Sequence, residues 1–236
     1  MIAVKIVSLA ALAGSAQAQN ATLRFMPFGD SITEIICWRA LLWEKLQTTQ
    51  FASVNWVGSN ADDEGNCNDS RYNNHNEGHS GYLASNIANS NELVGWLNAN
   101  PADVMTMHLG TNDIVQQNLA TTSIIAAFTT LVKQMRASNP NMKIIVAQII
   151  PLGLNVGTWN TQIQALNAAI PAWAQGLNST ASPIWVVDQY TGFDAATMLR
   201  DGVHPNAAGD QQMANVWYPA LMNALTVAQA EMMETA

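Results

Sequence analysis

Short apolar runs alternate with longer amphipathic runs along most of this chain, and this alternation limits the possible folds more than any other feature. The apolar runs cover residues 23–28, 53–58, 103–109, 143–150 and 184–188. The fourth is nearly continuous in Ile and Val, as expected for a strand that is covered on both faces of its sheet. Repeated strand–helix alternation predicts an α/β domain, in which a parallel sheet has helices on both faces.

Helices are expected in most of the intervening runs, because apolar residues recur there at helical spacing. These helices cover residues 33–46, 83–97, 122–137, 159–177 and 206–225. Pro171 should kink or interrupt the fourth helix, and Asn206 is the expected N-cap of the fifth. Residues 59–81 are rich in Asn, Asp and Gly, and predict a long loop of the kind that is usually functional or tied by a disulfide.

Composition narrows the class of protein. The 236 residues fit one α/β domain, and a hydrophobic content of 49% is enough for a substantial core. The net charge of -8, with only nine Lys and Arg residues, argues against a nucleic-acid partner. No apolar run beyond the N-terminus is long enough to span a bilayer. The glycine-rich dinucleotide fingerprint is absent after the first expected strand, so a nicotinamide or flavin enzyme is not expected.

The N-terminus predicts a secretory signal peptide. Lys5 supplies its positive charge, residues 6–14 its apolar core, and Ala16-Gln17-Ala18 a small-x-small cleavage site. The signal peptide therefore covers residues 1–18, and residues 19–236 form one mature domain. A buried first strand is the alternative interpretation of this run.

Secretion would also allow the only two cysteines, Cys37 and Cys67, to form a disulfide. Two free buried thiols are the alternative for a reducing compartment. Three N-glycosylation sequons begin at Asn20, Asn68 and Asn178, and they matter only in a host that glycosylates proteins.

Four polar clusters follow expected strands, at the edge of the sheet where α/β proteins bind their ligands. They are Gly29-Asp30-Ser31, His79-Ser80-Gly81, Gly110-Thr111-Asn112-Asp113 and Asp201-Gly202-Val203-His204. Nucleophilic serine catalysis needs a base, an acid that orients this base, and hydrogen-bond donors for an oxyanion. Together the clusters contain residues of every required type.

Ser31 is the candidate nucleophile, since a serine between a strand and a helix is open to substrate and lies near free backbone N–H groups. His204 is the candidate base, and Asp201, three residues before it, can orient the imidazole through a local turn. The side-chain amide of Asn112 and the backbone N–H groups of Gly81 and Ser31 are candidate oxyanion donors.

Each candidate also has a purely structural interpretation. Asp, Asn and Ser at such turns commonly cap helices, while His204 could be an ordinary loop histidine and Gly81 an ordinary turn residue. Asp113 is expected only to cap a helix or support its loop.

No metal or cofactor is expected. His75 and His79 lie in the polar loop, but no full ligand set with zinc spacing accompanies them. Asp62-Asp63-Glu64 is interpreted as solvated loop, with a calcium site as the alternative. His108, in the third expected strand, is interpreted as a buried histidine whose hydrogen bonds are satisfied.

The four clusters resemble, in order, the four sequence blocks of the SGNH hydrolases, also called the GDSL-like superfamily. The matching residues are Gly29-Asp30-Ser31, Gly81, Gly110-x-Asn112-Asp113 and Asp201-x-x-His204. The resemblance spans nearly the whole mature chain and implies a three-layer αβα sandwich around a five-stranded parallel sheet in flavodoxin-like order. It also implies that Ser31 is the nucleophile, that Gly81 and Asn112 are oxyanion donors, and that Asp201 and His204 complete a catalytic triad.

A narrower resemblance rests on the residues around two of these blocks. Residues 26–33, Cys37-Trp38-Arg39 and Gly78-His79-Ser80-Gly81-Tyr82 are similar to the acetylxylan esterases of carbohydrate esterase family three. Cys37 and Cys67 also resemble the disulfide of the fungal members. Ile32 stands where many lipolytic relatives have leucine, and no lid-like apolar segment is present, so a lipase is not favoured.

We therefore expect a secreted, monomeric serine esterase that removes acetyl groups from plant cell-wall polysaccharide, and from acetylxylan in particular. The reaction would pass through an acetyl-enzyme intermediate, without nucleic-acid or membrane partners. The alternatives are an esterase for another acetylated glycan, such as pectin or rhamnogalacturonan, a lysophospholipase, and a non-catalytic carbohydrate-binding module.

Overall fold

The computed structural model of the chain describes residues 22–61, 67 and 72–234. Several of the segments discussed above lie outside the described residues. They are the expected signal peptide, the sequons at Asn20 and Asn68, and the acidic stretch at 62–64. The predictions made for those segments therefore stay predictions.

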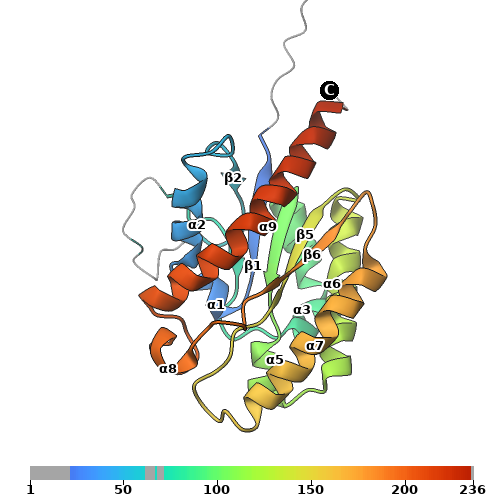
Figure 1. The fold of residues 1–236 in the computed structure, drawn as a ribbon. Coiled ribbons are helices and arrows are strands. Elements are labelled where there is room, and N and C mark those ends of the chain that lie inside the picture. The colour runs from blue at the N-terminus through green and yellow to red at the C-terminus, as the bar shows by residue number, and fades with distance from the viewer. Residues whose placement is uncertain (1–21, 62–66, 68–71, 235–236) are drawn as a thin grey trace, which may run out of the picture.

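A parallel sheet forms the middle layer of the molecule (Figure 1). Its strands are β1 (Arg24–Gly29), β2 (Asn55–Trp56), β3 (Glu77–Gly78), β4 (Val104–His108), β5 (Lys143–Gln148) and β6 (Ile184–Asp188). Their order is β2-β1-β4-β5-β6, and every pair is parallel. The predicted α/β class is confirmed. The described residues form six strands rather than five, because the short β3 also pairs with β1.

The additional strand β3 lies within the segment that was expected to be a continuous loop. β2 pairs with the start of β1, and β3 pairs with its end, where Phe28 is opposite Glu77 and Gly29 is opposite Gly78. A strand of two residues has no periodicity that a sequence could reveal. Its consequence is positional: β3 brings the residues that follow it to the carboxyl end of β1.

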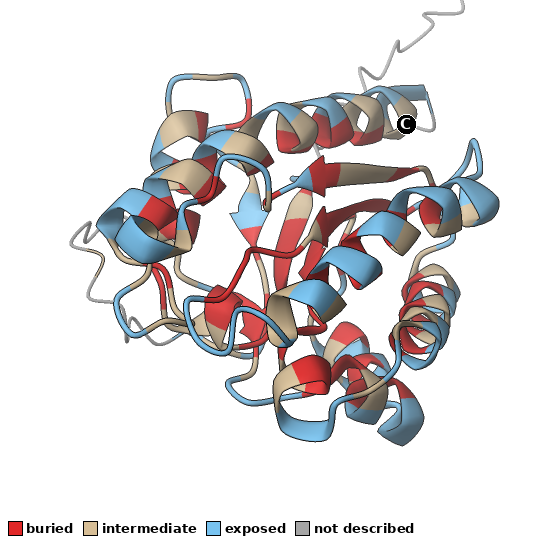
Figure 2. Cartoon of the chain, turned by 60° about the horizontal axis from the view of Figure 1, so that its bottom comes forward, coloured by how far each residue is buried: buried red, intermediate tan, exposed pale blue. Residues whose placement is uncertain are grey.

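Helices cover both faces of the sheet (Figure 1). One face carries α1 (Ser31–Glu34), α2 (Trp38–Leu46) and α9 (Ala207–Glu234), with α8 (Ala195–Met198) beside α9. The other carries α3 (Ala84–Ser90), α4 (Glu92–Ala99), α5 (Thr111–Gln117), α6 (Thr121–Ser138) and α7 (Trp159–Leu177). Each helical layer buries its own apolar cluster against the sheet, and Figure 2 shows the buried residues gathered on the strands and the inward helix faces.

Two expected helices are each divided into two. The helix predicted for 33–46 is interrupted between α1 and α2, and the one for 83–97 is interrupted at Asn91, whose φ of 54° is left-handed. The short α5 and α8 were not predicted. Asn206 is confirmed as the N-cap of α9, because its Oδ1 accepts hydrogen bonds from the N–H groups of Ala208 (2.9 Å) and Gly209 (3.3 Å).

A kink or an interruption was predicted at Pro171; the interruption is wrong, because α7 continues through this residue. Proline has no N–H, so the carbonyl of Asn167 loses its usual partner in the helix. The side-chain amide of Gln148, at the end of β5, donates to this carbonyl instead, at 2.8 Å. A contact from the sheet therefore compensates for the missing helical hydrogen bond.

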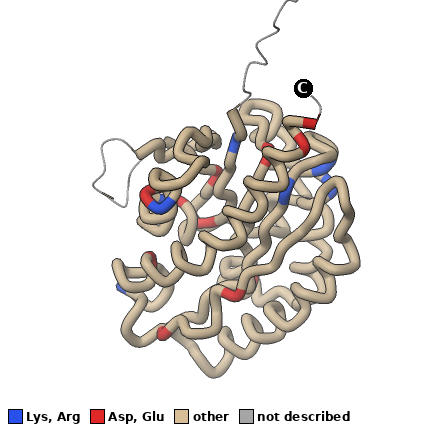
Figure 3. The backbone as a smooth tube through the Cα atoms, turned by 45° about the horizontal axis from the view of Figure 1, so that its top comes forward, with Lys and Arg blue, Asp and Glu red and all other residues tan. Residues whose placement is uncertain are grey.

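Two further properties of the described part of the chain concern its charge and its longest helices. Lys and Arg residues lie scattered over it rather than gathered on one side (Figure 3). Among the described helices, none combines the length and the apolar character that a membrane crossing requires.

Candidate active site

Ser31 lies where β1 turns into α1. Asp30 caps this helix, since its Oδ1 accepts a hydrogen bond of 2.9 Å from the N–H of Ile32. A side chain at Gly29 would place its Cβ 2.2 Å from the Oγ1 of Thr33 and 2.7 Å from the carbonyl oxygen of His108. Only glycine allows this close approach, so Gly29 and Asp30 each have a local structural cause.

The side chains of Ser31, His204 and Asp201 form a chain of hydrogen bonds. The Nε2 of His204 lies 2.9 Å from Ser31 Oγ, and its Nδ1 lies 2.8 Å from Asp201 Oδ2. The other carboxylate oxygen, Oδ1, accepts from the N–H groups of Val203 (2.9 Å) and His204 (2.8 Å). This local turn is the one expected from the spacing of Asp201 and His204. Such a chain can take a proton from a serine hydroxyl and stabilise the resulting imidazolium.

The hydrogen bonds of Asp201 affect its pKa. Partial burial raises the pKa of this carboxyl group, but the N–H and imidazole of His204 and the N–H of Val203 together outweigh burial and lower it from 3.8 to about 2. The group is therefore an anion at neutral pH, as the orienting member of a triad must be.

Two of the three expected oxyanion donors, Gly81 and Asn112, belong to neighbouring segments. Gly81 follows β3, and its φ of 80° lies in the left-handed region that favours glycine. Asn112 lies in the first turn of α5, and its Nδ2 donates to the carbonyl of Tyr82 at 3.1 Å. Within the described residues, no protein acceptor binds the N–H of Gly81. This N–H is therefore free to bind an anion.

Trp38 and Arg39 support the other end of α1. The indole Nε1 of Trp38 donates to the carbonyl of Ile32 at 2.7 Å. Arg39, which is only 2% exposed, donates to the carbonyls of Thr33 (2.6 Å) and Glu34 (2.8 Å). The last carbonyls of a helix have no partner within it, so these two side chains complete a helix of one turn. The sequence singled out Cys37-Trp38-Arg39 as a motif but gave no indication of this role.

Asp30, next to Ser31 in the sequence, and Asp113, whose charge acts on Asp30, are both buried. Asp113 accepts hydrogen bonds from the N–H groups of Ala84 (2.8 Å) and Ser85 (3.0 Å), so it caps α3 rather than its own helix. Asp30 is fully buried, and its Oδ2 has no partner among the described residues. Burial, together with the charge of Asp113, raises the pKa of Asp30 from 3.8 to about 7, although its bond from Ile32 N–H opposes the shift.

The histidines other than His204 have separate environments. His108 is buried, as expected, but its Nδ1 has no partner in the described part of the chain, and burial lowers its pKa from 6.5 to about 4. His75 Nδ1 contacts the carbonyl of Gly58. His79 stacks on Trp96, with ring centroids 4.0 Å apart, and its Nε2 lies 2.7 Å from Glu77. No group of three or more potential metal ligands occurs among the residues that the structure describes.

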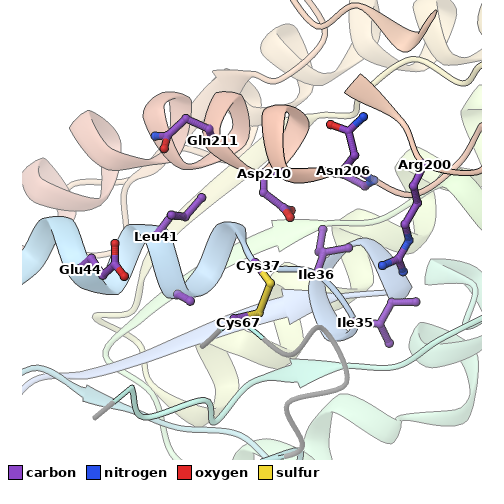
Figure 4. A pocket seen from close by; sticks show the side chains of 13 residues that line it. Ile35, Ile36, Cys37, Leu41, Glu44, Cys67, Arg200, Asn206, Asp210 and Gln211 are labelled. Carbon is purple, nitrogen blue, oxygen red and sulfur yellow. A yellow bond between two sulfur atoms is a disulfide. The ribbon is translucent and has the colours of Figure 1, made fainter. Parts of the chain in front are cut away.

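The expected disulfide between Cys37 and Cys67 is confirmed. Both cysteines line a cleft of about 530 Å³, whose other lining residues come mainly from α2 and the start of α9 (Figure 4). Arg200 and Asn206, which flank His204 in the sequence, line the end of this cleft together with Ile35, the residue after α1. The cleft therefore adjoins the segment that carries the histidine.

This chain is similar to known proteins in sequence and in fold. Residues 28–212 match the model of the GDSL-like Lipase/Acylhydrolase family. A solved carbohydrate esterase family 3 protein from Talaromyces cellulolyticus is 40% identical, with a TM-score of 0.81 over 87% of this chain and 99% of that one. A solved acetyl esterase variant with an acetate ion is 39% identical, with the same TM-score and coverage.

A curated relative is much longer than this chain. The multidomain esterase of Ruminococcus flavefaciens is 27% identical over 92% of this chain, which spans only 31% of that protein's length. The similarity therefore concerns one part of the relative.

Proposed function

Because this chain belongs to the GDSL-like lipase/acylhydrolase family and to carbohydrate esterase family 3, we propose that it removes O-acetyl groups from a plant cell-wall polysaccharide, with acetylxylan as the substrate. The observation that carries this proposal is the hydrogen-bonded chain of Ser31, His204 and Asp201 at the carboxyl end of the sheet. Membership of a carbohydrate esterase family supports a sugar ester, and likeness to an acetyl esterase supports acetate as the acyl group.

In this proposal, Ser31 Oγ attacks the acetyl carbonyl carbon while its proton passes to His204 Nε2. The carbonyl oxygen becomes an oxyanion, which accepts hydrogen bonds from the backbone N–H groups of Ser31 and Gly81 and from the side-chain amide of Asn112. Asp201 holds the imidazole in the required tautomer and stabilises its positive charge. His204 then protonates the departing sugar hydroxyl, and the acetyl group stays on Ser31.

Deacetylation repeats the same steps with water. His204 removes a proton from the water, which attacks the acetyl-enzyme, and the second oxyanion is bound by the same donors. Acetate leaves and the proton returns to Ser31. In this proposal, residues of the chain itself carry out every step of the reaction.

We further propose that residues 1–18 are removed during secretion and that residues 19–236 act as a monomeric domain outside the cell. The disulfide supports this, because disulfides persist in oxidising compartments. The N-terminal sequence of protein collected from culture medium would test it: a chain that begins at Gln19 supports cleavage, and one that begins at Met1 contradicts it.

The Ser31→Ala variant tests the catalytic proposal. It should lose hydrolysis of p-nitrophenyl acetate and acetate release from acetylxylan, while its thermal unfolding stays close to that of the wild type. Ser123→Ala, on the exposed surface of α6, makes the same change away from the site and should retain wild-type rates. Wild-type turnover by Ser31→Ala would contradict the assignment of the nucleophile.

Substrate class is tested separately by measuring acetate release from a panel of acetylated glycans. Acetylxylan should be preferred over acetylated pectin and rhamnogalacturonan. Faster release of acetate from pectin would indicate that pectin, and not xylan, is the substrate. A preference for long-chain acyl esters would indicate a lysophospholipase. A carbohydrate-binding module without catalytic activity would leave Ser31 unlabelled by an organophosphonate probe.

A further inference from the structure

Residues 79–82, here called the oxyanion loop, are held by hydrogen bonds from three other elements. The N–H of His79 donates to the carbonyl of Gly29 at 3.0 Å, which continues the pairing of β3 with β1. The N–H of Ser80 donates to Glu34 Oε2 at 2.5 Å. On the other side of the loop, Gln116 Nε2 donates to the carbonyl of Gly81 at 2.9 Å.

The contacts of Glu34 and Gln116 lie on either side of one peptide group. The N–H of Gly81 belongs to the peptide plane that joins it to Ser80. Glu34 binds the plane before it, and Gln116 binds the plane after it. A Cβ at Gly81 would have only one neighbour within 4 Å, at 3.9 Å, so close packing does not restrict this residue. The N–H of Tyr82 donates to the carbonyl of His79 at 3.1 Å and closes a turn around this peptide, but such a bond occurs in turns with either orientation of the central peptide. Because glycine has wide conformational freedom, the hydrogen bonds of Glu34 and Gln116 are the side-chain contacts that restrict rotation of this peptide.

Glu34 also relates the oxyanion loop to the nucleophile. Residues three apart lie on the same side of a helix, so the single turn of α1 presents Ser31 and Glu34 toward neighbouring positions. The helix touches β3 directly, since a Cβ at Gly78 would come within 2.6 Å of the backbone nitrogen of Glu34. One turn of helix thus carries the serine and binds the loop that carries the oxyanion donor.

We propose that Glu34 and Gln116 are positioning residues, which hold the N–H of Gly81 in the orientation that binds the oxyanion. This inference rests on the esterase activity proposed above. Neither side chain touches the reacting atoms in this scheme. Both act through the backbone of the loop, and a rotated peptide would turn the Gly81 N–H away from the developing negative charge.

Gln116→Glu is the most direct test. Glutamate has nearly the same shape as glutamine, but as a carboxylate it cannot donate to the Gly81 carbonyl. Gln117→Glu is the matched control, because it introduces the same charge one residue further along α5, where the structure places no contact with the loop. Both glutamines are exposed, so both variants should fold.

We expect Gln116→Glu to lower kcat for p-nitrophenyl acetate roughly tenfold, with little change in KM. This is less than the roughly 100- to 1,000-fold loss that follows removal of a whole oxyanion donor. A fall in kcat at constant KM indicates an interaction made only in the transition state. Binding of a boronic acid, which forms a tetrahedral adduct with Ser31 Oγ, should weaken by the same factor, because this adduct mimics the transition state.

Glu34→Ala should have a similar effect, and Glu34→Gln, which keeps an acceptor oxygen for the Ser80 N–H, should recover most of the lost rate. Wild-type kcat in both Gln116→Glu and Glu34→Ala would overturn the inference. Equal losses in Gln116→Glu and Gln117→Glu would also overturn it, because they would assign the effect to charge alone. If the wild-type protein itself had no hydrolysis dependent on Ser31, the proposed function would fail instead.

Discussion

Replacing Asp30 with asparagine should change how the stability of the protein depends on pH. The carboxyl group is fully buried, and its pKa is raised from 3.8 to about 7. This shift is about three pKa units, and each unit corresponds to about 1.4 kcal/mol. The folded state therefore keeps a proton that the unfolded chain releases near pH 4, and the resulting loss of stability between pH 4 and pH 7 amounts to about 4 kcal/mol.

The sign follows from which state binds more protons. Between pH 4 and pH 7 the folded protein holds the Asp30 proton and the unfolded chain does not, so the free energy of unfolding falls as the pH rises. Asparagine cannot ionise. Its side-chain oxygen can still accept from the N–H of Ile32, and its NH₂ group takes the place of Oδ2, which has no partner among the described residues.

Urea unfolding of the wild type and Asp30→Asn at pH 4, 6 and 8 measures this effect. Relative to the wild type, the variant should gain up to about 4 kcal/mol between pH 4 and pH 8. His108 has the opposite influence, because its lowered pKa makes stability fall as the pH drops from 6.5 to about 4. This contribution is present in both proteins and cancels in the difference. A difference between variant and wild type that is the same at all three pH values would refute the reasoning.

Three further predictions concern the proposed triad, the support of α1 and the disulfide. Asp201→Asn should lower kcat for p-nitrophenyl acetate by roughly four orders of magnitude, because the imidazole loses the group that sets its tautomer. In the wild type, the pKa of Asp201 is about 2. Any loss of activity between pH 6 and pH 4 should therefore not arise from protonation of this carboxylate. Arg39→Met should lower the free energy of unfolding by about 3 kcal/mol in a urea titration, since it leaves the buried carbonyl of Thr33 and the partly buried carbonyl of Glu34 without donors, and an unchanged midpoint would contradict this role. Replacing both Cys37 and Cys67 by serine opens a loop with a sequence separation of 30 residues and should cost about 3.5 kcal/mol in the same measurement, while Ser31-dependent hydrolysis of p-nitrophenyl acetate persists.

The parts of this fold that depend on local pattern were predictable. The strand at 184–188 and the helix at 159–177 have the predicted limits, because each has a regular apolar pattern with clear ends. The hydrogen bonds that join Ser31, His204 and Asp201 were predictable for another reason. The carboxyl ends of parallel strands meet at one edge of the sheet, so polar residues after different strands come together there.

The parts that depend on distant partners were not predictable. Apolar residues continue at helical spacing through residues 33–46, yet the chain turns between α1 and α2, where the Arg39 side chain binds two carbonyls of α1. Glu34 gave no signal at all, because its partner, Ser80, is 46 residues away in the sequence. Likewise, Gln148 compensates for Pro171 through a contact between the sheet and α7. In each case, the local structure depends on a tertiary contact. Such a contact cannot be predicted from the pattern of a short stretch of sequence.

The short length of α1 has a consequence for how the proposed nucleophile is held. A helix of one turn is unstable by itself, because nucleation fixes several residues for one hydrogen bond. The stability of α1 must therefore come from its neighbours: Asp30 caps its start, while Trp38 and Arg39 bind its last carbonyls. None of these side chains needs to touch a substrate. Because they determine where Ser31 Oγ lies relative to His204, substitutions at these positions should lower activity even where the hydrogen-bonded residues of the site are intact.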